Sequence, residues 1–360
     1  MVVAQSILYE KKGLSKITYT CYFEEKEAHE GDTVTFIEEI TNAKLLPVPW
    51  LKSELTTSKW LLFSELQSTV SDKTRFVSSF FMLKSYHKIV RKWKVTCLKR
   101  GVFAIDKAIL VSTDLFGQVN TSFPVILDEN MKITVIPRPL SLTEIINGDQ
   151  RLYGETLIRH RLIADPFYIN GIREYYEGEP EKRISWTATA RMNEIMVFNN
   201  DYTTDCNVAI IMNILSREND YKSIFSESGI EHCIKIAASL FAEAEAKNLP
   251  FKFMCNSADK FENPIVTPEG MGIEHADNLM RILAELEFTS TSSFEDFLES
   301  GCNLLPDTDI YIVTCYLNNE IIRFANSCKN CTLILAMSGE VYDTLPDCRL
   351  INLAKEADAV

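Results

Sequence analysis

Arginine and glutamate side chains lie close together in residues 173–191, and guanidinium–carboxylate pairing is the chemistry that this composition favours. The arginines are Arg173, Arg183 and Arg191, and the acidic residues are Glu174, Glu177, Glu179 and Glu181. A guanidinium group can bind a carboxylate through two parallel hydrogen bonds that fix the shape of a loop. The pattern therefore predicts a set of internal ion pairs, the ion-pair latch. The alternative is a docking surface on which some of the arginines face a partner.

Two further features of this segment concern its backbone and its packing. The run Gly178-Glu179-Pro180 predicts a chain reversal, because glycine and proline both interrupt regular structure. We expect Trp186 to be a buried anchor of the segment.

Cysteine is frequent, with ten residues, but the positions do not form a ligand or disulfide framework. Cys233 lies in a helical pattern and Cys315 in a strand pattern, where a thiol behaves as a small hydrophobic group. Cys328 and Cys331 have the C-x-x-C spacing but lie after a predicted helix, whereas a thioredoxin-type pair needs a helix N-terminus. A four-ligand zinc site needs a second pair, and only Cys348 follows. We therefore expect reduced thiols, as in a cytoplasmic protein, and no metal.

Catalytic motifs are missing from the sequence. The five histidines have no ligand spacing, and no nucleophile elbow, zinc-protease helix, phosphate-binding loop or dinucleotide fingerprint is present. Residues 268–272 contain two glycines before a helical pattern, but lack the basic residue of a phosphate-binding loop. We expect a protein without catalytic activity and without a cofactor.

The length and composition of the chain limit the number of domains and the kinds of partner that we expect. A chain of 360 residues is too long for one ordinary core and suggests two domains. The net charge of −13 argues against a nucleic-acid partner, which needs clustered lysine and arginine, and fits a basic protein partner or simple solubility. No run reaches the ~18 apolar residues that a membrane helix needs, and no signal peptide is visible.

The periodicity of apolar residues differs between the two halves. Residues 16–136 form short runs rich in β-branched and aromatic residues with frequent turns, which predicts an antiparallel β-sandwich. From about residue 194, apolar runs at 207–212, 251–254, 309–315 and 331–336 alternate with helical patterns at 230–247, 273–286, 294–298 and 319–327. This alternation predicts a parallel, doubly wound sheet with helices on both faces.

With these elements placed, residues 173–191 closely resemble the signature of the DUF58 family, which reads approximately R-E-Y-x-x-G-D-x-x-R-x-I-x-W-x-x-[ST]-A-R. The residues that carry the resemblance are Arg173, Glu174, Tyr175, Gly178, Arg183, Trp186 and Arg191. Glu179 stands where the family usually has aspartate. Further segments that resemble the family follow in the expected order: Glu30-Gly31-Asp32, Asn42 with Leu46-Pro47-Val48-Pro49-Trp50, Lys99-Arg100-Gly101-Val102-Phe103, Asp114-Leu115-Phe116-Gly117 and Ile136-Pro137-Arg138-Pro139.

The resemblance covers residues 16 to about 340 and implies a two-domain α+β protein. Residues 16–136 would be the β-sandwich, 137–170 the linker, and 171–360 an α/β doubly wound domain of the von Willebrand factor A type. The family commonly carries a hydrophobic helical hairpin before the sandwich. The resemblance therefore implies a membrane anchor ahead of Met1, with residues 1–15 as its remnant, on the cytoplasmic side of a bacterial membrane.

Domains of the A type bind Mg²⁺ through a D-x-S-x-S loop after the first strand and an aspartate from a later strand. Here Asn213, Leu215 and Arg217 occupy the loop positions, and Cys315 stands where the later carboxylate is expected. A hard cation needs oxygen ligands with at least one carboxylate. The resemblance therefore implies a degenerate metal loop that holds no metal, with Asn213 and Ser216 capping the loop instead.

Members of the family are commonly associated with MoxR-type AAA+ ATPases. The resemblance therefore implies a non-catalytic adaptor that works with such an ATPase, through residues 173–191 and the strand ends near Asn213 and Cys315. The alternative is an envelope protein that binds a carbohydrate on its β-sandwich. That alternative needs exposed aromatic side chains on one face of the sandwich, and Trp50, Trp60 and Trp93 are the candidates.

Overall fold

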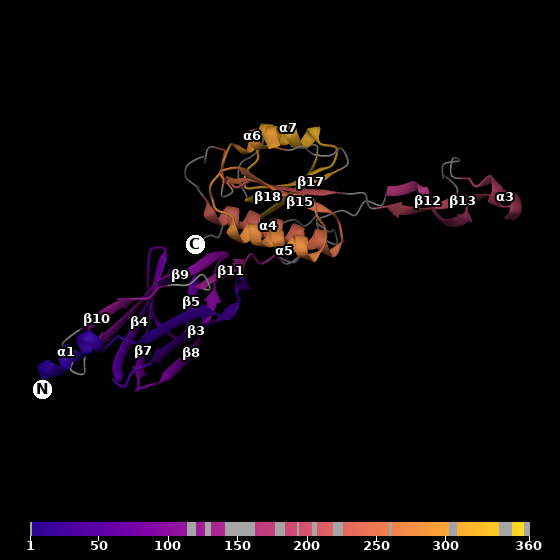
Figure 1. Cartoon of the computed structure of the whole chain (residues 1–360). Helices are drawn as coiled ribbons and strands as arrows, with labels where there is room; N and C mark the ends of the chain where they lie inside the picture. Colours follow the sequence, from indigo (N-terminus) through magenta and orange to yellow (C-terminus); the bar gives the residue numbers. More distant parts are fainter. Residues whose placement is uncertain are drawn as a thin grey trace. The chain divides into compact units, whose positions relative to one another are not determined.

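The computed structural model describes residues 2–113, 120–126, 131–140, 163–176, 184–192, 194–203, 207–218, 226–258, 261–301, 308–337 and 348–355 (Figure 1). Its residues cluster into two compact units. The first unit contains Met1–Arg138 with Asp277–Glu287, and the second contains Pro139–Ala276 with Phe288–Val360. The chain has a β-rich α+β fold with several sheets.

The first unit is built from two β-sheets and an N-terminal helix, α1 (Val2–Lys12). The smaller sheet has the order β1 (Ile17–Phe23), β3 (Thr33–Asn42), β8 (Lys88–Cys97) and β5 (Leu61–Phe63). The larger has the order β2 (Glu27–His29), β11 (Lys132–Ile136), β9 (Gly101–Thr113), β4 (Val48–Ser58), β7 (Thr74–Leu83) and β6 (Gln67–Ser71), with β10 (Asn120–Pro124) paired to β9. β11 and β2 pair in parallel, so the predicted antiparallel arrangement has one exception.

Alternating burial along the strands explains why these segments form a sandwich. In β7 every second residue from Arg75 to Leu83 is buried, and β4 shows the same period from Leu51 to Thr57. The inward residues of both sheets, including Phe36, Leu51 and Phe81, belong to one hydrophobic core.

The core of this sandwich contains a carboxylate that is fully buried. Glu38 accepts hydrogen bonds from Tyr19 Oη (2.7 Å), Ser53 Oγ (3.1 Å), Ser79 Oγ (3.0 Å) and Trp93 Nε1 (2.6 Å). Burial, followed by the charge of Glu38, raises the pKa of the Tyr19 phenol. These donors compensate for the loss of water around the carboxylate, and they fix Trp93 with its indole nitrogen toward the core.

A short segment from late in the sequence belongs to the first unit. Arg100 Nη1 donates hydrogen bonds to the carbonyl oxygens of Leu283 (2.9 Å), Ala284 (3.3 Å) and Leu286 (3.0 Å). These carbonyls lie at the C-terminal end of helix α5 (Ile273–Glu285), where a cation interacts favourably with the helix dipole. The sequence predicted one domain over residues 171–360, but Asp277–Glu287 belongs to the first unit.

The second unit contains a six-stranded sheet with the order β16 (Pro264–Val266), β15 (Phe251–Ala258), β14 (Val208–Met212), β17 (Asp309–Thr314), β18 (Cys331–Met337) and β19 (Arg349–Lys355). Every pair is parallel except β15 with β16. All residues of β14 and β17 are buried, as expected for central strands that are covered on both faces.

Helices cover both faces of this sheet (Figure 1). α4 (Glu227–Ala246) contacts β14, β17 and β18 on one face, and α6 (Phe294–Gly301) and α7 (Asn319–Ser327) lie on the other. The Ser226 hydroxyl caps α4 by accepting a hydrogen bond from Gly229 N, and Asn318 caps α7 in the same way from Ile321 N.

A separate two-stranded ribbon carries the residues that resemble the family signature. β12 (Ile163–Glu174) pairs with β13 (Met196–Thr203), and the short helix α3 (Trp186–Met192) lies between them in sequence. Residues 163–170, predicted as linker, are therefore part of a strand. The rest of the predicted linker up to residue 162 lies outside the described residues after Leu140, as do residues 114–117.

Within the described ranges, the structure has no helix that combines the length and the apolar character needed to span a membrane.

Candidate functional site

The carboxyl ends of β14, β15 and β17 meet at one edge of the second unit's sheet. Met212 is in register with Cys255 of β15 and with Val313 of β17. In such sheets, ligands usually bind at the carboxyl edge where the strand order changes direction, which here is β14, because β15 and β17 lie on opposite sides of it. We call this region the carboxyl edge.

Three fully buried polar residues at the carboxyl edge bind one another. Asn213 Oδ1 accepts hydrogen bonds from Leu215 N (3.0 Å) and Asn256 Nδ2 (3.3 Å). Asn213 Nδ2 donates to Thr314 Oγ1 (3.2 Å), and Asn256 Oδ1 accepts from Ile214 N (2.8 Å). These side chains therefore hold the loop after β14 in place, and the amide oxygens are already engaged by donors.

The predicted metal-loop positions present no ligand set for a hard cation. Leu215 is buried and has no side-chain oxygen, while Arg217 is exposed. Cys315 is buried, with its sulfur 3.4 Å from that of Cys233 in α4. In the described part of the chain, no group of three or more His, Cys, Asp or Glu residues is arranged to hold a metal ion. Because Asn213 and Cys315 are buried, the proposed partner surface at these strand ends is corrected: neither side chain can face a partner.

Two carboxylates that the sequence did not single out also lie at the carboxyl edge. Asn318 Nδ2 donates to Glu218 Oε1 (3.0 Å) and to Glu295 Oε1 (2.6 Å), and Tyr316 Oη donates to Glu295 Oε1 (3.3 Å). Burial, then the charges of Glu295 and Glu218, raise the pKa of the Tyr316 phenol above its usual range. Nothing in the sequence predicted this cluster, because its members come from a loop, a helix and a helix cap that are distant along the chain.

The described residues of the carboxyl edge contain hydrogen-bond acceptors and donors, but no set of groups that forms a catalytic site. Its polar atoms are tied to caps and loops, as Asn318 Oδ1 is to Ile321 N. Of the described histidines, His232 contacts the carbonyl of Leu353 and His275 that of Phe251, so both rings are held by backbone groups. The described residues of the carboxyl edge contain no nucleophile with an adjacent base.

The signature segment, defined as residues 172–176 and 184–195, presents large apolar side chains to solvent. Trp186 is 71% exposed, Tyr176 67% and Met192 65%. Ile172 and Ile195 are about half exposed. Helix α3 buries none of its residues. The prediction that Trp186 is a buried anchor was therefore wrong.

Hydrogen bonds attach α3 to β13. The backbone of buried Ser185 donates to Met196 O (2.8 Å), and Thr189 Oγ1 accepts from Met196 N (3.0 Å). These bonds use backbone and hydroxyl groups, and the Trp186 ring stays 71% exposed. The spacing of the signature residues in the sequence could not predict whether the ring points inward or outward.

The predicted signature residues have different environments in the structure. Arg173 Cζ lies 5.5 Å from the centre of the Tyr176 ring, and Arg173 Nη1 donates to Glu174 O (3.1 Å). Tyr175 is half-buried and its backbone donates to Ile195 O, whereas Arg191 is exposed on α3. Gly178, Glu179 and Arg183 lie outside the described residues, so the ion-pair latch stays a prediction.

The three tryptophans considered for carbohydrate binding also differ. Trp50 is 58% exposed, and Phe80 and Met82 on the adjacent strand are similarly exposed. Trp93 points its ring nitrogen to buried Glu38, and Trp60 is half-buried beneath the ammonium groups of two lysines. One of the three therefore has a ring available for stacking.

No family model matches the sequence, and no curated protein matches it significantly. Among solved structures, the chain has 11% identity to a cohesin module from a Clostridium perfringens family 33 glycoside hydrolase, over 34% of this chain and 98% of that one, with a TM-score of 0.23. It has 11% identity to the sporulation control protein Spo0M of Bacillus subtilis, over 38% and 56% of the two chains, with a TM-score of 0.21. It has 20% identity to native alpha-2-macroglobulin from Escherichia coli, over 35% and 7%, with a TM-score of 0.24. Scores this low support no inference about fold or function.

Proposed function

We propose that this protein is a non-catalytic adaptor that binds a protein partner through its signature segment. The observation that carries the proposal is the exposure of Trp186, Tyr176 and Met192, of which the first and last lie on a helix without a buried residue. Aromatic residues, methionine and arginine are the residue types enriched at the centres of protein interfaces. Large apolar side chains exposed within one short segment are consistent with an interaction site.

The resemblance of this segment to the DUF58 signature supplies the identity of the partner. The proposed partner is a MoxR-type AAA+ ATPase, and the proposed location is the cytoplasmic face of a bacterial membrane. The second unit would then be an A-type domain that has lost its metal loop. Its six-stranded sheet with helices on both faces supports that assignment.

The absence of an oxygen ligand at Leu215 and the engaged amide of Asn213 are consistent with this assignment. Both side chains stabilise the loop after β14, so partner binding would not depend on a bridging cation. In this respect the proposed adaptor differs from adhesion domains in which Mg²⁺ completes the interface.

The test is a direct titration with a purified MoxR-type ATPase from the same organism. The proposal predicts saturable binding that changes with nucleotide, measured by calorimetry with ATP, with ADP and without nucleotide. Binding that is absent under all three conditions would contradict it. The titration without nucleotide gives an internal reference, because adding EDTA there should leave the affinity unchanged if no cation bridges the partners.

A carbohydrate-binding envelope protein is the second candidate, and the exposure of Trp50 beside Phe80 and Met82 favours it. Sugar rings stack on exposed aromatic faces, and Trp50, Phe76 and Phe80 are each about half exposed on this face of the sandwich. A glycan panel tests it. Glycan binding that is lost in Trp50→Ala and retained in Trp186→Ala would show that the β-sandwich binds the ligand.

A further inference from the structure

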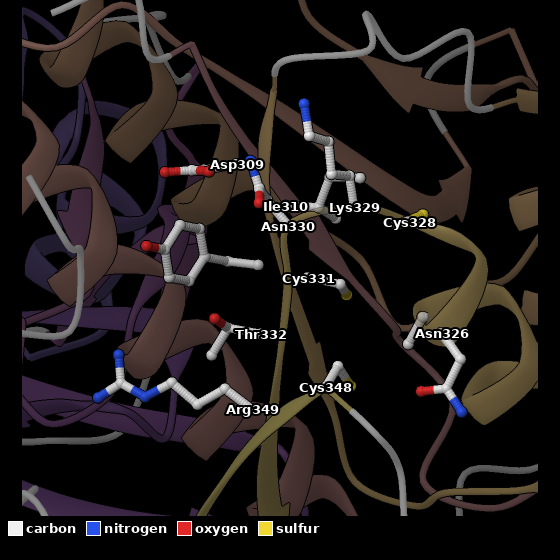
Figure 2. A pocket seen from close by; sticks show the side chains of 12 residues that line it. Asp309, Ile310, Asn326, Cys328, Lys329, Asn330, Cys331, Thr332, Cys348 and Arg349 are labelled. Carbon is white, nitrogen blue, oxygen red and sulfur yellow. The ribbon is translucent and has the colours of Figure 1, made fainter. Parts of the chain in front are cut away.

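Three cysteines line a pocket at the opposite, amino-terminal edge of the sheet in the second unit. The pocket has a volume of about 440 Å³, and its walls include Cys328, Cys331 and Cys348 (Figure 2). Cys328 ends α7, Cys331 begins β18, and Cys348 immediately precedes β19. We call this the thiol pocket. Its third cysteine is brought there by strand pairing and not by sequence spacing.

Strand register places Cys331 and Cys348 side by side. β18 and β19 are adjacent and parallel, with Thr332 opposite Arg349. The residues one position earlier, Cys331 and Cys348, are therefore lateral neighbours. Adjacent strands lie about 4.8 Å apart, which is within the separation of α-carbons that a disulfide bridges. Figure 2 shows both thiol side chains on the same side of the sheet, while Thr332 and Arg349 point to the other.

The electrostatics of the thiol pocket agree with this arrangement. The pKa of Cys331 is raised above its usual range, first by its hydrogen bond with the Cys348 thiol and then by burial. The pKa of Cys328 is raised by burial and also by the charge of Cys348. The three thiols therefore influence one another directly.

The thiols differ in their access to solvent, and this difference sets the order in which they react. Cys331 is 8% exposed, whereas Cys348 and Cys328 are half-buried. Of the neighbouring pair Cys331 and Cys348, Cys348 is thus the more accessible thiol. Arg349 and Lys329 also line the pocket, and such cationic side chains favour anionic ligands.

We infer that the thiol pocket is a site of thiol–disulfide exchange, in which Cys348 reacts with a low-molecular-weight disulfide and Cys331 resolves the product. The Cys348 thiolate attacks one sulfur of the disulfide, forms a mixed disulfide and releases the first small thiolate. Cys331 loses its proton to solvent and attacks the Cys348 sulfur, which expels the second small thiolate. The two cysteines are oxidised to one disulfide, and the small disulfide is reduced to two thiols.

A metal site is the other chemistry that three thiols suggest, and the structure does not support it. No group of three or more ligand side chains in the described residues is arranged around a common point. Pairwise contact between Cys331 and Cys348 suits a disulfide, which needs two sulfurs and not four ligands.

The test exposes the reduced full-length protein to oxidised glutathione at about pH 8 for long enough to reach equilibrium, and then blocks the remaining thiols with an alkylating agent. Peptide mapping by mass spectrometry should find a cross-link between Cys331 and Cys348 that dithiothreitol reverses. A cross-link between Cys328 and Cys331, or between the buried pair Cys233 and Cys315, would overturn the assignment. So would complete alkylation of Cys331 and Cys348 at the highest glutathione ratio.

A variant pair tests the order of the steps. Cys331→Ser removes the resolving thiol, so glutathione should remain on Cys348 at a level roughly tenfold above wild type. Cys233→Ser is the matched control: it removes a buried thiol of the same unit whose sulfur contacts Cys315, and it should leave the Cys331–Cys348 cross-link unchanged. Equal glutathione on Cys348 in wild type and Cys331→Ser would contradict the resolving role. If Cys331→Ser does not fold, the cross-link map of the wild type still decides the inference.

Discussion

The carboxyl edge and the signature segment use their side chains in opposite ways. At the carboxyl edge, polar groups are buried and satisfied by each other, as Asn213 is by Leu215, Asn256 and Thr314. In the signature segment, large apolar groups are exposed and lie on a helix without a buried residue. The usual ligand edge of such a sheet thus has polar groups that stabilise it, and the signature segment has the exposed apolar groups that we propose as the partner surface.

The largest effect is expected from removing the central amide of the carboxyl edge. Asn213→Ala leaves Leu215 N and the Asn256 and Thr314 side chains without their partner, which should lower the free energy of unfolding by about 2–4 kcal/mol. Urea denaturation measures this. Asn207→Ala, just before the same strand, is the control and should cost less than about 0.5 kcal/mol because its hydrogen bond to Glu269 is exposed. Similar losses for both variants would show that Asn213 is not a structural centre.

Trp186→Ala should weaken binding of the ATPase by about 2 kcal/mol, or roughly 30-fold, because a tryptophan at an interface is a frequent hot spot. Its stability should change by less than about 0.5 kcal/mol, since the side chain is 71% exposed. Calorimetry gives the affinity and thermal unfolding gives the stability. Trp50→Ala, in the other unit, is the matched control and should bind normally. A loss of stability without a loss of affinity would show that Trp186 anchors the segment in the fold and does not bind the partner.

The arginines of the signature segment separate the docking surface from the ion-pair latch. Arg173→Ala and Arg183→Ala should each weaken partner binding by about 1 kcal/mol and leave the melting temperature nearly unchanged. Arg323→Ala, at an exposed position of α7, controls for the loss of one positive charge. Variants of Arg173 or Arg183 that unfold would instead establish the latch, because a broken set of internal ion pairs destabilises the fold.

The Tyr316 phenol should make the stability of the protein depend on alkaline pH. Its pKa is raised in the folded protein, so the folded state keeps a proton that the unfolded chain loses above about pH 10. Stability from this group is therefore present below pH 10 and falls above it, by at most about 1.4 kcal/mol per pH unit. Tyr316→Phe should show a shallower decline than wild type between pH 10 and 11 in urea titrations. Identical slopes would mean that the phenol is not shielded at the carboxyl edge.

The smallest effect is expected from divalent cations. Mg²⁺ or Mn²⁺ at millimolar concentration should shift the melting temperature by less than about 1 °C, because a ligand stabilises only a state that binds it. Differential scanning fluorimetry with and without EDTA measures the shift. A rise of the melting temperature by several degrees would instead indicate that a metal ion binds at the carboxyl edge.

Local patterns in the sequence predicted the elements well. The apolar spacing of residues 230–247 corresponds to α4, and the predicted helix at 319–327 is α7 with Asn318 as its cap. The β-branched runs before residue 136 became the strands of the first unit. These helices and strands depend on the types of residues within a few positions of one another, so they can be predicted from the sequence.

What the sequence could not predict depends on pairing between distant segments. The meeting of Cys331 with Cys348 follows from the register of β18 and β19, and the cluster of Asn318, Glu218 and Glu295 follows from how three separate segments converge. The exposure of Trp186 also depends on how α3 packs against the rest of the fold, which the local sequence does not contain. The spacing of residues along the sequence does not predict these contacts.

The most direct test of the central claim is a map of where the ATPase protects this protein. Hydrogen–deuterium exchange or hydroxyl-radical footprinting, with and without the partner, reports each region of the same sample. We predict protection of the signature segment, residues 172–176 and 184–195, with the carboxyl edge and the face around Trp50 unchanged. Protection of the carboxyl edge or of the Trp50 face, with the signature segment unchanged, would contradict the account.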